Sequence, residues 1–169
     1  MKRTDLDLAL IQLVEEIEKE RKEKDQKTIR KKSPFSRQIT ENITSISELD
    51  FYISLNLKEK FVTRPALIAK IDPNFVDSRG KSNLEKMLKG TPPMDPNSKE
   101  TYHLHHLGQN PEGPFIELLP SQHTSAVVFL ILHNSKDESW RKNKSLQRDF
   151  EAQKKKHWIK RGKGFNEKQ

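Results

Sequence analysis

The 169-residue sequence contains no cysteine. This absence excludes disulfide bonds and cysteine-ligated zinc modules, so any metal must be held by histidine, carboxylate or amide side chains. Glycine is scarce, with six residues, and neither a P-loop, nor a dinucleotide fingerprint, nor a Gly-x-Ser-x-Gly motif occurs. The longest apolar run, 126–132, is too short to span a bilayer, and the first residues lead into an amphipathic segment rather than the apolar block of a signal peptide.

Hydrophobic residues make up only 32% of the chain and charged residues 33%. This balance predicts one compact domain with solvated extensions. The formal net charge is +8, and the surplus lies near the end of the chain, because residues 136–169 contain 12 Lys and Arg against 5 Asp and Glu. Such a cluster favours contact with a phosphate backbone, although a lysine-rich solvated helix explains the composition equally well.

The first part of the chain predicts a helix. Residues 5–24 carry apolar side chains at helical spacing, and the Glu/Lys/Arg-rich segment that follows is a solvated helix end or a flexible linker. Ser33-Pro34 should end the helix. We interpret residues 1–48 as a helical, charged extension or linker and residues 49–169 as the compact domain. The alternative is that the first helix packs on that domain.

The middle of the chain predicts short elements separated by turns. Phe51–Ile53 and Phe61-Val62 suit short strands or a mixed lead-in, whereas Ser82–Glu85 forms a capping box that predicts a short helix to about Leu88. Thr101–His106 and Phe115–Leu119 are expected to pair as strands around a strong turn at Asn110–Pro114.

Two helices are predicted after the strand pair. A new element begins at Pro120, where Ser121 is a plausible N-cap and His123 lies in the first turn. Residues 137–160 predict a basic helix with a sparse apolar face, followed by a frayed tail over 161–164.

Three of the six histidines lie within four residues, at His103, His105 and His106. On a strand, His103 and His105 share one face and His106 takes the other, unless a bulge or bend at the strand end brings neighbours together. One imidazole of such a pair can then hold a cation while the next takes a proton from water. A single histidine is more often structural, but the cluster favours a metal site.

Further ligands are expected after the strand pair. His123 should face the strands from the first turn of the following helix. His133 can join the same ion only if the helix ends between these two residues, because ten helical residues span about 15 Å.

The order of these motifs resembles the LHH nucleases, which belong to the HNH/endonuclease VII superfamily and occur as C-terminal toxin domains of bacterial polymorphic toxins. The resemblance covers 57–165 and is carried by an ordered series of segments: Asp72–Asp77, Asn83–Met87, Gly90–Pro93, Leu104-His105-His106, Gly108-Gln109, Pro114–Leu118, His123, Leu132-His133 and His157–Arg161. It implies an α+β fold with a small ββα-metal (HNH-type) nuclease core, surrounding helices and an N-terminal helical extension, and it makes 49–169 an HNH-like LHH nuclease domain.

The resemblance also implies roles for individual residues. His105 and His123 would be metal ligands, and His133 a further ligand or a phosphate contact. His106 would be the general base, and Gln109 would orient that base or bind phosphate. The wider superfamily often has another ligand four residues after the first helix ligand, where this chain has Val127.

These roles predict a metal-dependent endonuclease, a DNase acting as an antibacterial toxin, with one divalent ion: zinc, nickel, manganese or magnesium. The expected partners are DNA, with RNA as the variant substrate, and a cognate immunity protein. The toxin would act in the cytoplasm of the target bacterium, secreted or delivered as part of a larger toxin. Five basic side chains are expected to grip the nucleic-acid backbone: Lys154, Lys155, Lys156, Lys160 and Arg161.

Two other hypotheses remain open from the sequence. The protein could be a non-catalytic, metal-stabilised module that binds nucleic acid, or an interaction protein whose N-terminal helix is the working part.

Overall fold

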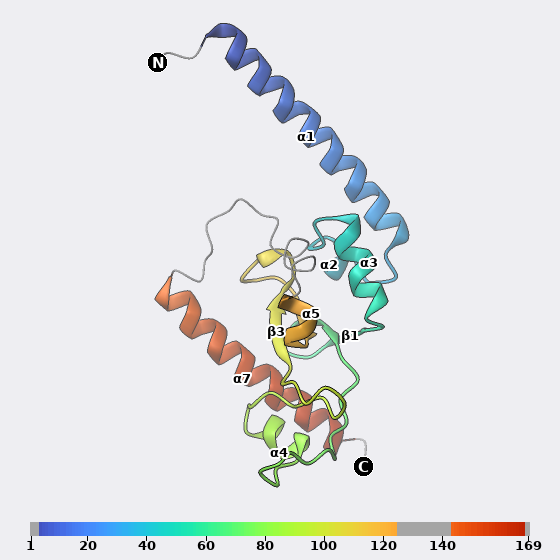
Figure 1. The fold of residues 1–169 in the computed structure, drawn as a ribbon, viewed down its shortest axis with the longest axis vertical. Coiled ribbons are helices and arrows are strands. Elements are labelled where there is room, and N and C mark those ends of the chain that lie inside the picture. The colour runs from blue at the N-terminus through green and yellow to red at the C-terminus, as the bar shows by residue number, and fades with distance from the viewer. Residues whose placement is uncertain (1–3, 125–142, 168–169) are drawn as a thin grey trace.

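The computed structural model describes residues 4–124 and 143–167, and Figure 1 shows a long helix projecting from a body in which a small sheet lies among helices. The elements are α1 (Asp5–Lys32), α2 (Arg37–Thr40), α3 (Ile46–Ser54), β1 (Lys58–Phe61), β2 (Pro65–Ile68), α4 (Asn83–Leu88), β3 (His103–His106), the 3-10 turn η1 (Leu107–Gln109), β4 (Phe115–Leu118), α5 (Pro120–Thr124) and α7 (Lys144–Asn166). The α+β class is confirmed. Within the two described ranges, no helix is both long and apolar enough to cross a membrane.

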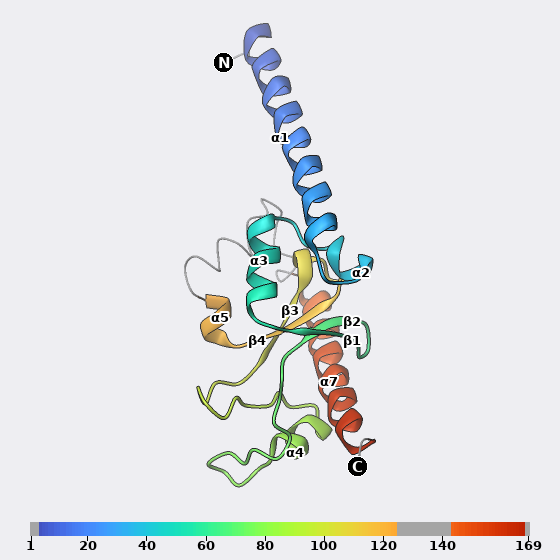
Figure 2. The same ribbon diagram turned by 90° about the vertical axis from the view of Figure 1, so that its right-hand side faces the viewer.

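Helix α1 begins at a capping box and continues through the charged segment that could have been either a helix end or a linker. The Asp7 amide donates to the Thr4 hydroxyl at 3.2 Å, and the Thr4 amide donates to the Asp7 carboxylate at 3.0 Å. The Glu- and Lys-rich second half continues the helix because these residues have high helix propensity. The helix ends at Lys32, as Ser33-Pro34 predicts. Figure 2 shows most of α1 extending away from the body.

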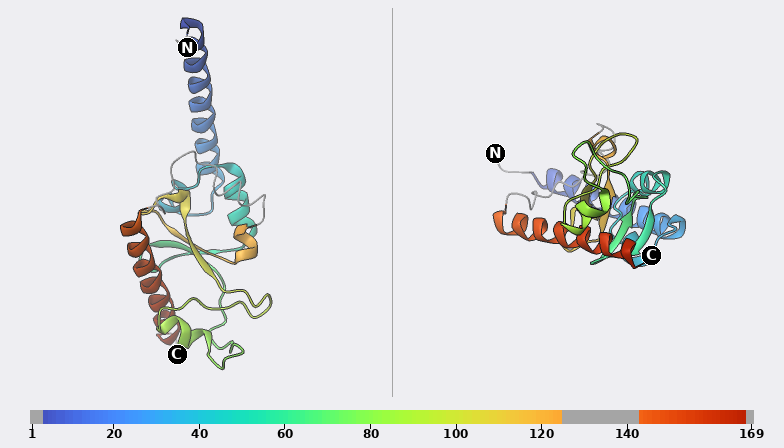
Figure 3. Two further views of the ribbon diagram at one scale, coloured as in Figure 1. Left: turned by 60° about the vertical axis from the view of Figure 1, so that its left-hand side comes forward. Right: turned by 90° about the horizontal axis from the view of Figure 1, so that it is seen from below.

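The sheet has four strands in the order β1-β2-β4-β3. β1 pairs with β2 and β3 pairs with β4 in antiparallel fashion, while β2 and β4 run parallel. The predicted hairpin of two strands around the turn is therefore confirmed, with His105 opposite Ile116 and His106 opposite Phe115. β3 is therefore an edge strand of the sheet. Figure 3 shows the sheet and the helices around it from two further directions.

Each face of the sheet has its own apolar core. One cluster joins Leu67, Ile116 and Leu118 of the sheet to side chains of the first three helices and the segments between them. The other joins Ala66, Leu104 and Phe115 to α4, α7 and nearby loops. Because side chains alternate along a strand, neighbouring residues of β3 and β4 belong to opposite layers.

The prediction of a short strand or a mixed lead-in at Phe51–Ile53 is wrong, because these residues lie in α3. Ser45 caps this helix, its hydroxyl accepting the Glu48 amide at 3.1 Å. Glu48, Leu49 and Tyr52 are the buried residues, and this spacing is helical. Burial on a helical period therefore outweighed the β-propensity of the aromatic and β-branched triplet.

The frayed tail predicted at 161–164 is also wrong, since α7 continues to Asn166. Arg161 and Gly162 are buried. A Cβ on Gly162 would come within 3.1 Å of both the Leu88 amide nitrogen and the Met87 Cβ. The glycine therefore allows α7 to approach α4 closely, and packing rather than propensity sustains the last turns.

The packing crosses the boundary expected at residue 48. Ile29, Ile39 and Ile43 are fully buried in the same cluster as Leu67 and Ile116. The Gln26 side-chain amide also donates to the Ile43 carbonyl oxygen at 2.8 Å. Only the earlier turns of α1 extend from the body, while the segment from the end of α1 onward forms part of the core.

Candidate active site

Four histidines lie on the β3–β4 hairpin and the helix that follows it: His103, His105, His106 and His123. The hairpin connection passes through Gly108, whose φ of +61° is in the left-handed region. A Cβ there would lie 2.7 Å from the Asn42 carbonyl oxygen. Glycine thus permits both the turn and its close approach to the N-terminal segment, which holds the end of β3 in place.

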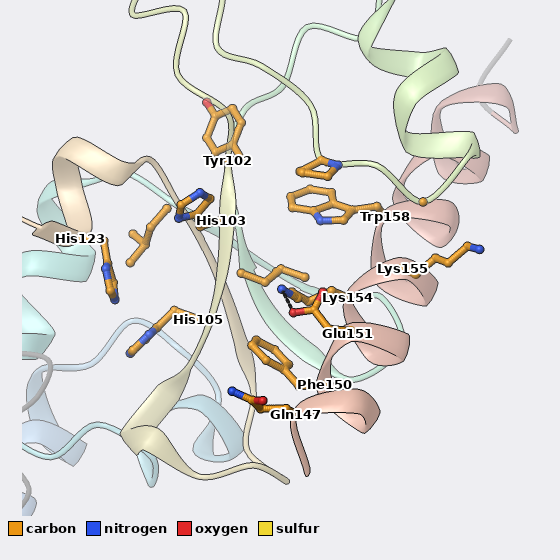
Figure 4. Close-up of a pocket in the computed structure, with 14 residues that line it drawn as sticks. Tyr102, His103, His105, His123, Gln147, Phe150, Glu151, Lys154, Lys155 and Trp158 are labelled. Carbon is orange, nitrogen blue, oxygen red and sulfur yellow. Dashed lines mark ion pairs between the residues drawn. The ribbon is translucent and has the colours of Figure 1, made fainter. Parts of the chain in front are cut away.

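His105 and His123 face each other at the corner between the hairpin and α5. Their ring centroids are 4.9 Å apart, and the ring planes are inclined at 59°. His105 is buried and His123 half-buried. Figure 4 shows both rings on the same side of β3. The structure therefore brings together the two residues that the sequence predicts as metal ligands.

The first turn of α5 is anchored by side-chain hydrogen bonds. The Ser121 amide and hydroxyl donate to the two carboxylate oxygens of Glu100 at 2.8 and 2.6 Å. The Leu119 amide donates to the Gln122 side-chain oxygen at 2.8 Å. The hydrogen bond from the Ser121 hydroxyl is the main cause that lowers the pKa of Glu100. These bonds hold the turn from which His123 projects.

The spacing of the His105–His123 pair fits a shared cation. Zinc binds imidazole nitrogen at about 2.0–2.1 Å, so two rings on one ion at roughly 90–110° have centres about 4.5–5.2 Å apart. The observed 4.9 Å lies within that range. Nitrogen donors suit zinc, nickel or manganese better than magnesium, which prefers oxygen.

A third ligand is not identified in the described part of the chain, where no three His, Asp or Glu side chains form a group that could hold an ion. His133 lies outside the described residues. The side chain of Gln109 is also outside them.

His106 lies on the opposite face of β3, beneath α7. Its ring centroid is 4.3 Å from that of Phe150 and 5.0 Å from that of Phe115. A cavity of about 240 Å³ beside it is also lined by Glu112, Asp149 and Lys156, among others. The pairing of β3 with β4 is regular up to His106, so no bend turns this side chain toward His105. Because β3 is an edge strand, both histidines nevertheless border the free edge of the sheet.

A larger cavity of about 770 Å³ lies against β3 and extends from the His105–His123 pair to α7. His103 lines it and is exposed. Tyr102, Phe150 and Trp158 contribute aromatic rings. Figure 4 shows Tyr102, the histidines and the α7 side chains around this space.

The basic side chains predicted to contact nucleic acid have different positions. Lys154 and Lys155 line the larger cavity, Lys156 lines the smaller one beside His106, and Lys160 is exposed. Arg161 is buried and donates to Glu117 and to the Ala69 carbonyl oxygen. The expectation that Arg161 contacts phosphate is therefore corrected, because its guanidinium is enclosed between α7 and the sheet.

Sequence reasoning missed the buried polar cluster of Glu117, His157 and Arg161. The Glu117 carboxylate lies 2.8 Å from His157 Nε2 and accepts from Arg161 Nε at 2.8 Å. It also accepts the Ala69 amide at 2.9 Å. The sequence contained a signal for this cluster. One carboxylate lies in the apolar strand at 115–118, and a histidine and an arginine lie four residues apart on α7, where they can share one partner.

Comparison with protein families supports the interpretation of this region as a nuclease domain. Residues 82–164 match the model of the LHH family, a nuclease of the HNH/ENDO VII superfamily with a conserved LHH motif. This segment contains Leu104-His105-His106, His123 and most of α7. Residues 82–164 are therefore an LHH nuclease domain, and the resemblance found in the sequence is confirmed for this segment. No solved structure matches the chain.

Proposed function

We propose that this protein is a metal-dependent endonuclease that hydrolyses DNA and acts as an antibacterial toxin. The observation that carries the proposal is the facing pair of His105 and His123 at the corner of a β3–β4–α5 unit. This unit lies within the segment that matches the LHH nucleases. Histidine pairs at such a corner are suited to holding a cation beside a phosphate.

In the proposed mechanism, His105 and His123 hold the divalent ion. When bound, this ion supplies positive charge that polarises the phosphate and stabilises the departing oxygen. His106 accepts a proton from a water molecule as the water oxygen bonds to phosphorus. The bond from phosphorus to the 3′ oxygen breaks, and that oxygen takes a proton from solvent. Since the two faces of β3 separate His105 from His106, the phosphate would approach over the free edge of this strand.

Basic side chains would hold the substrate without reading its sequence. Lys154, Lys155, Lys156 and Lys160 lie along α7, and the first three also line the two cavities that border β3. Lysine contacts to phosphate supply sequence-independent affinity through counterion release. RNA remains the variant substrate, because phosphate contacts of this kind are common to both nucleic acids.

The toxin role rests on the resemblance of the sequence motifs to nuclease domains of bacterial polymorphic toxins. It implies action in the cytoplasm of a target bacterium, as a secreted protein or as part of a larger toxin, and a cognate immunity protein. The basic charge favours an acidic immunity protein, since complementary charge accelerates association and improves specificity.

The second candidate function is a non-catalytic, metal-stabilised module that binds nucleic acid. It is favoured by the position of His106, which packs against two phenylalanine rings on the face away from His105. A histidine placed in this way can serve packing alone.

Plasmid nicking by the purified protein, with and without a chelator, tests the proposal. We expect chelator-sensitive nicking, and a loss of roughly 10²–10⁴-fold in His106→Ala, the usual contribution of a general base. His103→Ala is the comparison variant, because it removes an exposed imidazole from the same strand that lines the larger cavity but takes no part in the proposed proton transfer, and it should lower nicking much less. Circular dichroism and metal content show whether each variant is folded and loaded.

The outcomes separate the two functions. Loss of nicking in His106→Ala with metal content and DNA binding retained supports the enzyme. An unfolded or metal-free His106→Ala protein supports the structural module. Absence of chelator-sensitive cleavage of both DNA and RNA by the unaltered protein would overturn the nuclease proposal.

A further inference from the structure

The larger cavity combines three kinds of chemistry beside the His105–His123 pair. Leu104 and Leu118 line it with apolar atoms, Phe150 contributes a half-buried aromatic ring beside the buried Tyr102 and Trp158, and Gln147 contributes a polar amide on α7. Flat apolar and aromatic walls with a few hydrogen-bonding groups suit a planar heterocycle. A site that binds only phosphate needs only charged groups. The apolar and aromatic lining therefore indicates that the cavity also binds the base of a nucleotide.

Lys154 adds positive charge to this cavity. Its ammonium lies 2.5 Å from the Glu151 carboxylate and 4.9 Å from the centroid of the Phe150 ring. Figure 4 shows Lys154 directed from α7 toward β3, whereas Lys155 points away from the centre of the cavity. Glu151 is largely exposed, so its ion pair with Lys154 is weak and a phosphate can replace it.

The volume of the cavity fits one nucleotide. Cavities of about 300–1,000 Å³ hold small organic ligands, and this one measures about 770 Å³. In a B-form duplex the faces of the bases are covered by their stacked neighbours, so they cannot enter a pocket. A base enters only when it is single-stranded or has left the stack.

We propose that this cavity holds one unstacked nucleotide next to the cleaved phosphate, so the enzyme prefers single-stranded or locally unpaired DNA. The base packs against Phe150, the half-buried ring of the lining, while Tyr102 and Trp158, which are 6% and 2% exposed, contribute little accessible surface, and Lys154 contacts the adjoining phosphate. This inference rests on the proposed nuclease function, because it names the substrate class of the same site.

Binding measurements on the full chain carrying His106→Ala test the inference while the DNA stays intact. Fluorescence anisotropy compares a labelled short single strand with the same sequence in a fully paired hairpin. We expect the single strand to bind about tenfold more tightly, within the range of base–aromatic stacking. If His106→Ala does not fold, the unaltered protein in the presence of a chelator replaces it.

Two lysine variants give a matched comparison on one helix. Lys154→Glu should remove most of the preference for single strands. Lys160→Glu reverses the same charge on an exposed side chain of α7 that does not line the cavity, and it should weaken binding to both DNAs by similar factors. Equal effects of the two variants on the preference would contradict the proposal.

Tryptophan fluorescence reports on the cavity directly. The chain has two tryptophans, so Trp140→Phe leaves Trp158 as the reporter. Single-stranded DNA should change the Trp158 emission, and the paired hairpin should not. Equal binding of the two DNAs, or an unchanged Trp158 emission, overturns the inference even if nicking is observed. A strand preference without any chelator-sensitive cleavage leaves the subsite standing and overturns the nuclease function.

Discussion

At the scale of single residues, the Glu117 carboxylate of β4 binds two side chains of α7 and so holds this helix against the sheet. It is fully buried, and its partners His157 and Arg161 are buried with it. A buried charge is tolerated only when opposite charges and hydrogen bonds compensate for the lost hydration. Arg161 also donates to the Ala69 carbonyl oxygen at 3.0 Å, so one cluster links α7 to β4 and to the end of β2.

Removing this carboxylate should be costly. We expect Glu117→Ala to lower the free energy of unfolding by about 3–5 kcal/mol, because Arg161 would remain buried without a counter-charge. Urea denaturation of the full chain measures this change.

A matched control is available on α7, the helix that the Glu117 cluster holds. Glu151→Ala breaks an exposed carboxylate–lysine pair with Lys154, and it should cost less than about 1 kcal/mol. Losses of equal size in the two variants would show that burial does not govern the strength of the Glu117 cluster.

At the scale of secondary structure, α1 is two segments with different roles. Its first turns expose Leu6, Leu10, Leu13 and Ile17, each by more than half of its surface. Its last turns place Ile29 in the core. Exposed apolar surface of this kind is typical of an interaction site, which keeps the interaction-protein hypothesis testable.

Truncation should separate these two segments. Deleting residues 1–22 should change the free energy of unfolding by less than about 1 kcal/mol, because the side chains of residues 4–22 are all exposed. Deleting residues 1–40 should unfold the protein, since it removes the buried side chains of Ile29 and Ile39. Urea denaturation measures both effects.

Nicking assays on the shorter truncation test the interaction hypothesis. If cleavage survives deletion of 1–22, the exposed helix is not the catalytic part. If cleavage is lost while the fold is retained, the function lies in α1.

At the scale of the whole molecule, the uneven charge should govern nucleic-acid affinity. The formal net charge is +8, and the C-terminal region carries most of the surplus. Burial of Arg161 removes one of the expected phosphate contacts, whereas Lys160 stays exposed. Each phosphate contact releases counterions, so affinity must fall as salt concentration rises.

A salt titration checks this point. Lys160→Ala should reduce the slope of log affinity against log salt concentration by about 1. Lys22→Ala removes an equal charge from the exposed part of α1 and should leave the slope unchanged. If both variants and the unaltered protein give the same slope, Lys160 does not contact phosphate.

Much of the fold could be predicted from local patterns. The capping box at Ser82 begins a helix, Ser33-Pro34 ends one, and the turn at Asn110–Pro114 joins two paired strands. These signals depend on hydrogen bonds and backbone preferences within a few residues. The predictions failed at Phe51–Ile53 and at 161–164, where packing against distant residues outweighed local propensity.

The sequence by itself determined the chemistry that this protein can offer. The absence of cysteine excludes cysteine ligands, the spacing of the histidines favours a histidine-based metal site, and the order of the motifs resembles that of the LHH nucleases, because ligand type and local geometry are encoded in short segments. Only the tertiary structure decided which of these groups meet. It brings His105 to His123, places His106 beneath Phe150 and encloses Arg161 with Glu117. The physical reason is that burial and proximity depend on elements far apart in the chain, which no local pattern specifies.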